Sequence, residues 1–206
     1  ALEVRPVLDA IGAGAHRVSE IASRMGRPAT SVARPLARLV EMGLATREVP
    51  FGEAGSKRAL YRIADPFFRM WFRVVAPNRG PLATMTGPAR RSLLARQWPY
   101  LLASTWEQLC RDALPRLGEW LPGMRWWRGN EPEWDVVAES IDRRTLLLGE
   151  VKLRAKQGDV EELLGRPMPS FVGGRSVVRA LFARDPRGLR AKGVLLIGSS
   201  RVFRSH

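Results

Sequence analysis

The chain has 206 residues, of which 45% are hydrophobic and 26% are charged, so it has enough sequence for two small domains and is neither disordered nor collagen-like. Charged residues interrupt every apolar run before it reaches the ~20 residues of a membrane-spanning helix, which excludes an integral membrane protein. Thirty-four Lys and Arg against 20 Asp and Glu give a formal charge of +14, so nucleic acid is the first partner to consider. A genomic base composition that favours arginine codons would produce the same excess.

Cysteine and histidine are too few for several kinds of site. The single cysteine, Cys110, cannot form a disulfide within the chain, and residues 1–6 show no basic leader before an apolar stretch. We therefore expect a protein of the reducing cytoplasm. His16 and His206 lie far in sequence from Cys110 and from every acidic cluster, which argues against a structural zinc site and against Ser-His-acid hydrolysis.

The N-terminal third is predicted to contain three short helices and a hairpin. Apolar residues recur at helical spacing, and glycines end each helical segment. The expected elements are a helix around 7–11, a second from Ser19 as N-cap to Met25, a third capped by Thr30 or Ser31 and ending at Gly43, and strands over 44–49 and 59–63. This order predicts a winged helix-turn-helix over residues 1–64.

Basic side chains lie where a winged helix would contact DNA. Arg27, Arg34 and Arg38 are near or on the third helix, and Lys57 and Arg58 lie in the loop of the wing. Side chains at these places can reach phosphates and base edges, which makes these five the candidate DNA-binding residues. Many winged helices dock on proteins instead, so both kinds of partner stay open.

A helical bridge is expected to follow the wing, over residues 65–88. Asp65 is a good N-cap and Pro66 suits the first helical position. The helix behind them is apolar nearly all round, which predicts that it is buried. The structure-breaking residues of 76–81 place the domain boundary between Ala76 and Pro88.

The remaining residues, 89–206, alternate between helical and β-like patterns. The predicted order is helices over 88–98 and 101–117, β-like runs over 124–128, 133–141 and 145–153, a helix over 159–164, and β-like runs over 177–183 and 193–198. Helices and strands that alternate in this way indicate an α/β domain with layers around a mixed sheet.

The second and third β-like runs form a hairpin that carries the candidate chemistry. A turn centred just after Asp142 would place Asp135 opposite Glu150, and Lys152 would point to the same face because strand side chains alternate. Two facing carboxylates repel each other, and a divalent cation would neutralise them. Mg²⁺ or Mn²⁺ held by Asp135 and Glu150 could polarise a phosphate and activate water, with the Lys152 ammonium beside it.

An acid followed about fifteen residues later by acid-apolar-Lys resembles the PD-(D/E)XK nuclease superfamily, and the segment EWDVVAESIDRRTLLLGEVK carries this resemblance. Trp134 stands where the name of the superfamily has proline. The superfamily often adds a glutamate from the helix before the sheet, and Glu107 in STWEQLCRDAL matches that position. The resemblance implies Mg²⁺-dependent hydrolysis of DNA by Asp135, Glu150, Lys152 and Glu107, in a restriction-endonuclease-like domain.

The order of segments along the chain resembles the C-terminal region of archaeal-type P-loop ATPases, where a winged helix precedes a domain of unknown function. The winged helix, the run YRIADPFFRMWFRVVAPNRG, the WW pair and the EWDVVA to GEVK hairpin carry this resemblance. It implies an ATPase module upstream in a longer protein or as a separate partner, and a start at Ala1 fits a C-terminal piece. The sequence holds no G-x-x-x-x-G-K-[ST] loop, so this chain cannot bind ATP in that way.

An alternative function belongs to a different class, a catalytically inactive module that binds DNA or protein and regulates. Nuclease superfamilies contain such inactive members. An inactive descendant would be free to lose its acids, whereas Asp135, Glu150 and Lys152 are all present.

Overall fold

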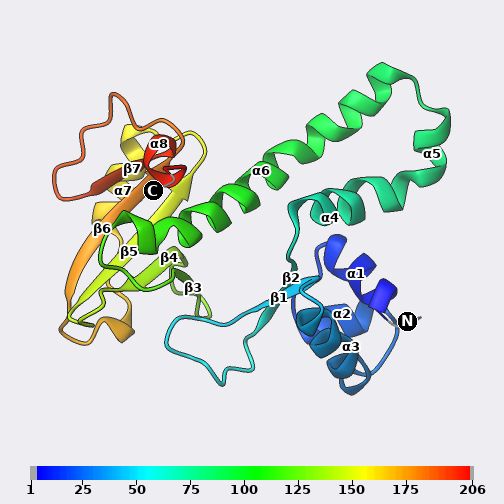
Figure 1. The fold of residues 1–206 in the computed structure, drawn as a ribbon, viewed down its shortest axis with the longest axis horizontal. Helices are drawn as coiled ribbons and strands as arrows, with labels where there is room; N and C mark the ends of the chain where they lie inside the picture. Colours follow the sequence, from blue (N-terminus) through cyan, green and yellow to red (C-terminus); the bar gives the residue numbers. More distant parts are fainter. Residues whose placement is uncertain (1–3, 205–206) are drawn as a thin grey trace. The chain divides into compact units, whose positions relative to one another are not determined.

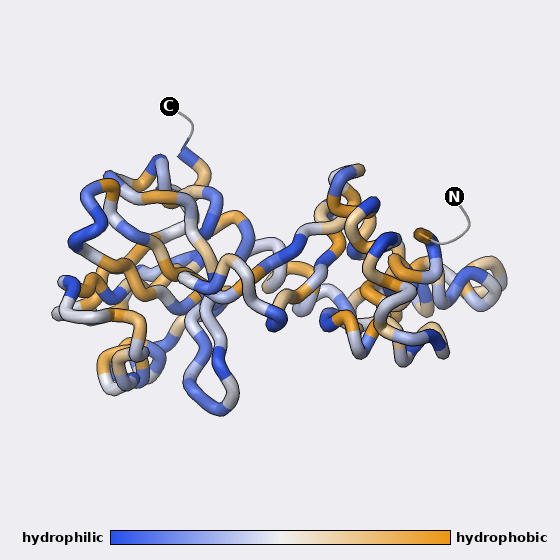
Figure 2. The backbone as a smooth tube through the Cα atoms, turned by 90° about the horizontal axis from the view of Figure 1, so that it is seen from below, coloured by the Kyte–Doolittle hydropathy of each residue, from blue (hydrophilic) through white to orange (hydrophobic). Residues whose placement is uncertain are grey.

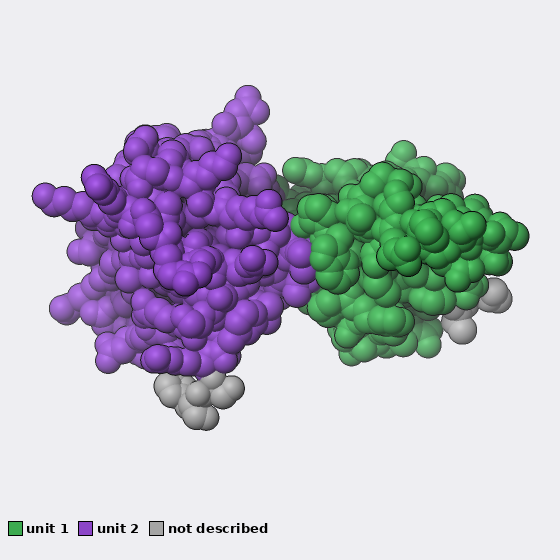
Figure 3. All heavy atoms as spheres, turned by 90° about the horizontal axis from the view of Figure 1, so that it is seen from above, with its two compact units in different colours: residues 1–49, 55–101 green, residues 50–54, 102–206 purple. Residues whose placement is uncertain are grey.

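The computed structural model describes residues 4–204, and the chain forms two compact units. The first unit comprises residues 1–49 and 55–101, and the second comprises residues 50–54 and 102–206 (Figure 3). Within residues 4–204, no helix combines the length and the apolar character that crossing a membrane requires.

The first unit begins with the predicted winged helix-turn-helix (Figure 1). Its elements are α1 (Val4–Gly12), α2 (Val18–Arg24), α3 (Ala29–Glu41), β1 (Ala45–Glu48) and β2 (Leu60–Ile63), with β1 and β2 antiparallel. The apolar stripes of the three helices meet in one core, which includes Val7, Ile21 and Leu36. Burial of these stripes is the main force that holds short helices of this kind together.

Two of the predicted helix starts are wrong by two or three residues. The N-cap of α2 is Arg17 and that of α3 is Pro28. The α2 helix begins earlier because Glu20 Oε2 accepts hydrogen bonds from the backbone N–H groups of His16 at 2.8 Å and Arg17 at 3.0 Å. Ser31 lies inside α3, where its hydroxyl donates to the carbonyl oxygen of Pro28 at 2.7 Å.

The segment after the wing is helical, as predicted, but it is not buried. It contains α4 (Pro66–Met70), the π-helical turn η1 (Trp71–Val75), the 3-10 turn η2 (Ala76–Asn78) and α5 (Arg79–Thr84). Asp65 caps α4 by accepting a hydrogen bond from Phe68 N at 3.1 Å. Phe67 is nevertheless 58% exposed, and Val74 is the only buried residue of 66–75. The segment packs closely on α1, because a Cβ on Gly12 would come within 2.5 Å of Phe72 Cβ. Arg69 also donates to the carbonyl oxygen of Ile63 in β2 at 2.9 Å.

Helix α6 (Gly87–Leu117) is one helix where the sequence predicts two. Pro99 lies inside it, where a proline removes one backbone hydrogen bond without ending the helix. The two compact units divide at residues 101 and 102, within α6, and not between Ala76 and Pro88. The first half of α6 belongs with the first unit because Arg73 donates to Gln97 Oε1 at 3.0 Å and its guanidinium lies 3.9 Å from the centre of the Tyr100 ring.

The second unit is an α/β domain built on a mixed five-stranded sheet, as predicted. The strands, in their order across the sheet, are β3 (Met124–Trp126), β4 (Trp134–Glu139), β5 (Thr145–Lys152), β6 (Ser176–Ala183) and β7 (Leu195–Gly198). The pairs β3–β4 and β4–β5 are antiparallel, and the pairs β5–β6 and β6–β7 are parallel. The remaining elements are α7 (Gln157–Gly165), the 3-10 turn η3 (Ser170–Val172) and α8 (Ser199–Val202).

Both faces of the sheet are covered. One face packs on the second half of α6, through a core that includes Cys110 and Leu114. The other packs on α7, through a core that includes Val160 and Leu163. Apolar stretches accordingly run through the strands of this unit (Figure 2). Such a sheet holds rigid backbone positions, so polar side chains placed on it keep a defined geometry.

Candidate active site

The hairpin β4–β5 has the register that the sequence predicts. Val136 pairs with Gly149 and Val137 pairs with Leu148, and Asp135 and Glu150 are the next residues on the two strands. Glu150 lies on the face that α7 covers, to which Leu148 also contributes a buried side chain. The pairing of β4 with β3 shifts register between Trp134 and Val137, so alternation alone does not fix the face of Asp135. The carboxylates of Asp135 and Glu150 line the same cavity.

Asp135 is a largely buried acid with a raised pKa. Its Oδ2 accepts a hydrogen bond from the backbone N–H of Val151 at 3.0 Å. Removal from water, and then the negative charges of Glu150 and Glu107, raise the pKa of Asp135 from 3.8 to about 6, although the hydrogen bond from Val151 acts in the opposite direction. A positive charge placed beside Asp135 would therefore favour its ionised form.

Glu150 is buried, and both of its oxygens are paired with cations. Oε1 lies 2.8 Å from Lys152 Nζ, and Oε2 lies 2.6 Å from Arg166 Nη1. Burial lowers the pKa of Lys152, but the hydrogen bond and the charge of Glu150 outweigh it, so that this pKa is raised overall. Lys152 therefore carries its charge within contact of the glutamate, as the sequence predicts for their shared face.

Arg166 is a residue of this site that the sequence analysis missed. It directly follows α7, and its guanidinium donates to Glu150, to Glu162 Oε1 at 3.1 Å and to the carbonyl oxygen of Glu133 at 2.9 Å. It also lies 5.0 Å from the centre of the Trp134 ring. Its side chain is 10% exposed. No periodicity or motif marks an arginine in a loop sixteen residues from its partner, so sequence reasoning had no signal for it.

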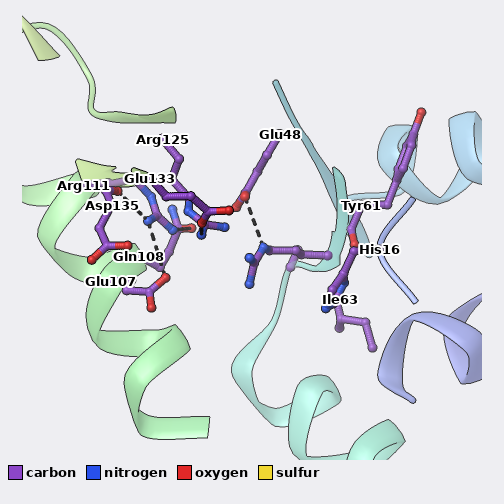
Figure 4. A network of polar contacts seen from close by, with 12 residues as sticks. His16, Glu48, Tyr61, Ile63, Glu107, Gln108, Arg111, Arg125, Glu133 and Asp135 are labelled. Atoms are coloured by element: carbon purple, nitrogen blue, oxygen red, sulfur yellow. Dashed lines mark hydrogen bonds and ion pairs between the residues drawn. The ribbon is translucent and has the colours of Figure 1, made fainter. Parts of the chain in front are cut away.

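Glu107 and Arg111 come from α6, one helical turn apart. Arg111 Nη1 donates to the backbone carbonyl oxygen of Asp135 at 3.1 Å and lies 3.9 Å from Glu107 Oε2. Figure 4 shows these three residues together, with Arg111 reaching from the helix toward the strand. The Glu107 side chain is 23% exposed, and its charge raises the pKa of Asp135. The structure thus brings Glu107 near the facing carboxylates, as a neighbour of Asp135.

A cavity of about 740 Å³ opens at these residues. Four carboxylates and one guanidinium line it, from Glu133, Asp135, Glu150, Glu162 and Arg166. Within residues 4–204, no three or more His, Cys, Asp or Glu side chains form a group that could hold a metal ion. Mg²⁺ is commonly held by only one or two carboxylates, with waters and substrate oxygens as its other ligands. Asp135 and Glu150 fit that donor set if the ion pair between Arg166 and Glu150 Oε2 is broken, because this oxygen can then bind the cation.

The candidate DNA-binding residues all lie in the first unit. Arg27, Arg34, Arg38 and Lys57 are exposed to solvent, and Arg58 is half-buried. Arg34 and Arg38 lie one helical turn apart on α3, opposite its buried residues. Four of these five residues are therefore exposed to a partner.

Two family models match parts of the chain. Residues 71–163 match DUF234, described as archaeal and bacterial proteins of unknown function, and residues 7–48 match the IclR helix-turn-helix domain. The first match includes Glu107, Asp135 and the β5 residues of the site. The second agrees with the fold of the first unit.

A relative and a solved structure are also similar to this chain. An uncharacterized protein of Methanocaldococcus jannaschii is 27% identical over 168 residues, which cover 77% of this chain and 38% of that protein. The chain therefore spans well under half the length of this relative. The structure of the SdaI restriction endonuclease aligns with 82% of this chain and 70% of its own, at 15% identity and a TM-score of 0.22, a value too low to establish a shared fold.

Proposed function

We propose that the second unit is a restriction-endonuclease-like domain of the PD-(D/E)XK type that hydrolyses phosphodiester bonds of DNA with Mg²⁺ or Mn²⁺. The observation that carries this proposal is the pair Asp135 and Glu150, which lie on neighbouring strands close enough to affect each other's charge and line one cavity. The charge of Glu150 opposes ionisation of Asp135, and Lys152 and Arg166 neutralise Glu150 alone. A role in holding a cation gives this costly arrangement a purpose.

Each residue has a distinct role in this proposal. Asp135 and Glu150 would hold the cation, and Lys152 would orient the attacking water and stabilise negative charge on the phosphate. When bound, the cation would polarise the phosphate and lower the pKa of a coordinated water. Glu107 acts as a positioning residue in this proposal, because its charge raises the pKa of Asp135 and its neighbour Arg111 donates to the backbone carbonyl oxygen of Asp135.

The winged helix supplies binding in this proposal. Arg27, Arg34, Arg38, Lys57 and Arg58 would contact the phosphates and base edges of DNA. An archaeal-type P-loop ATPase module, upstream in a longer protein or as a separate chain, is the proposed partner. The length of the relative from M. jannaschii leaves room for such a module there.

A second candidate function is a regulatory module that binds DNA or protein without hydrolysing it. The ion pairs of Glu150 favour this candidate, because Lys152 and Arg166 already neutralise the carboxylate that the cation would need. A carboxylate whose oxygens are both ion-paired with protein side chains has a structural role that needs no metal ion.

A cleavage assay separates the two candidates. The purified chain is incubated with plasmid, linear duplex and single-stranded DNA in Mg²⁺, in Mn²⁺ and in chelator. We expect hydrolysis that needs one of the two ions, that falls by several orders of magnitude in Asp135→Asn and Glu150→Gln, and that is slowed in Lys152→Ala. Glu161→Gln, an exposed acid on α7, is the matched control and should cleave like the wild type. Absence of cleavage with both ions would favour the regulatory module.

A further inference from the structure

The guanidinium of Arg166 stands in the position that a cation at Glu150 would have to share. It contacts Glu150 Oε2 at 2.6 Å, and both side chains are about nine-tenths buried. Removing one partner of a buried ion pair strongly destabilises the fold, because it leaves a buried charge without compensation. Either the guanidinium or another cation must therefore neutralise Glu150 Oε2. Arg166 and a divalent ion are therefore competitors for the same group.

The Arg166 guanidinium has other contacts that would persist if its ion pair with Glu150 were broken. The Trp134 ring, the carbonyl oxygen of Glu133 and the carboxylate of Glu162 all contact the guanidinium, and none of them belongs to the facing pair. The Arg166 backbone is held as well, because its carbonyl oxygen accepts from Arg179 Nη2 at 3.0 Å. The guanidinium can thus turn within the cavity without leaving it.

The charges that line the cavity determine which kind of ligand the Arg166 guanidinium could bind there. Four of the five charged groups that line it are carboxylates, so Arg166 is the cationic lining group available to an anion there. A planar guanidinium donates two parallel hydrogen bonds to the oxygens of a phosphate, which an ammonium cannot do. A phosphodiester that entered this cavity would meet Arg166 first.

We propose that Arg166 is the phosphate-binding residue of this cavity, paired with Glu150 in the absence of a divalent cation and transferred to a phosphodiester oxygen of nucleic acid when a cation occupies Glu150. This inference rests on the proposed function, because it needs both ligands at one site. Its consequence is positive coupling between the cation and DNA, with each ligand favouring the arrangement of Arg166 that the other requires.

Two binding measurements test the exchange without any turnover. Mn²⁺ binding to the full chain is titrated by electron paramagnetic resonance in the absence of DNA. Binding of a fluorescein-labelled duplex is then followed by anisotropy, in chelator and in Ca²⁺. The variants are Arg166→Gln and the matched control Arg175→Gln, whose guanidinium pairs with Glu139 at 2.6 Å in the same unit.

Loss of the competing charge should tighten Mn²⁺ binding of Arg166→Gln about tenfold, because a charge-assisted hydrogen bond no longer opposes the ion. The same variant should lose most of the gain in DNA affinity that Ca²⁺ gives the wild type. Arg175→Gln should match the wild type in both measurements. Unchanged or weaker Mn²⁺ binding by Arg166→Gln would overturn the inference and leave Arg166 with a structural role.

The inference and the proposed function fail in different ways. If Arg166→Gln binds Mn²⁺ more tightly while the wild type cleaves no DNA, the exchange stands and hydrolysis is refuted. If the wild type cleaves DNA while Arg166→Gln binds Mn²⁺ with the same affinity as the wild type, hydrolysis stands and the exchange is refuted. If neither the wild type nor any variant binds Mn²⁺, both are refuted. Should the glutamine variant fail to fold, Arg166→Lys keeps the charge without the planar donor pair, and a gain of a few-fold in Mn²⁺ affinity is the expected result.

Discussion

Ionisation of Asp135 should reduce the stability of the second unit. Its pKa is raised from 3.8 to about 6, first by burial and then by the charges of Glu150 and Glu107. An acid whose pKa is higher in the folded than in the unfolded chain contributes stability that is fully present below the unfolded pKa and is lost as the pH rises through the folded pKa. The loss at Asp135 therefore occurs between pH 3.8 and about 6.

Asp135→Asn removes this ionisation and leaves most other contacts in place, because the amide oxygen can still accept from Val151 N–H. Each pKa unit corresponds to about 1.4 kcal/mol, so the variant should be more stable than the wild type by about 2 to 3 kcal/mol at pH 8. The difference should shrink toward zero near pH 4. Mg²⁺ should narrow the difference at pH 8, because a bound cation stabilises the ionised aspartate.

Urea unfolding in chelator, from pH 4 to pH 8, measures this effect. Tryptophan fluorescence follows the unfolding, and three of the tryptophans, Trp126, Trp127 and Trp134, are buried in the second unit. Asp142→Asn is a control in the same hairpin with the opposite sign, because the hydrogen bond from Ser140 lowers the pKa of Asp142. A difference between Asp135→Asn and wild type that does not change with pH, or a less stable variant at pH 8, would refute the reasoning.

Three further predictions follow from the exposed and charged residues. Reversing both charges of the wing in Lys57→Glu with Arg58→Glu should weaken duplex binding and flatten its dependence on salt while cleavage chemistry persists, and binding that ignores salt would instead indicate a protein partner. Glu107→Gln should lower the pKa of Asp135 in an NMR titration, since it removes a charge that raises this pKa; an unchanged pKa would place Glu107 outside the site. Phe67→Ser should change the free energy of unfolding by no more than about 0.5 kcal/mol, because this ring is 58% exposed; a larger loss in urea unfolding would mean that α4 is buried in solution.

Local chemistry determined much of this protein without any tertiary information. Asp65 and Pro66 start α4 as predicted, because capping and the fixed φ of proline act within one helical turn. The register of β4 and β5 also follows from the sequence, because a tight turn after Asp142 and the two-residue alternation of strands leave one pairing that buries Val137 and Leu148. The closeness of Asp135 to Glu150 at the end of this pairing is therefore largely a consequence of neighbouring residues.

Tertiary structure decided what no local pattern encodes. The aromatic segment after Asp65 looked like a core helix, but its contacts with α1, β2 and α6 leave Phe67 exposed. The sequence predicted two helices over 88–98 and 101–117, yet contacts of Arg73 with Gln97 and Tyr100 help to hold the first half of a single helix. Arg166 reaches Glu150 only because α7 packs across the sheet and ends beside β5. Charge pairing between distant segments is set by packing, so the state of the candidate site could be read only from the folded chain.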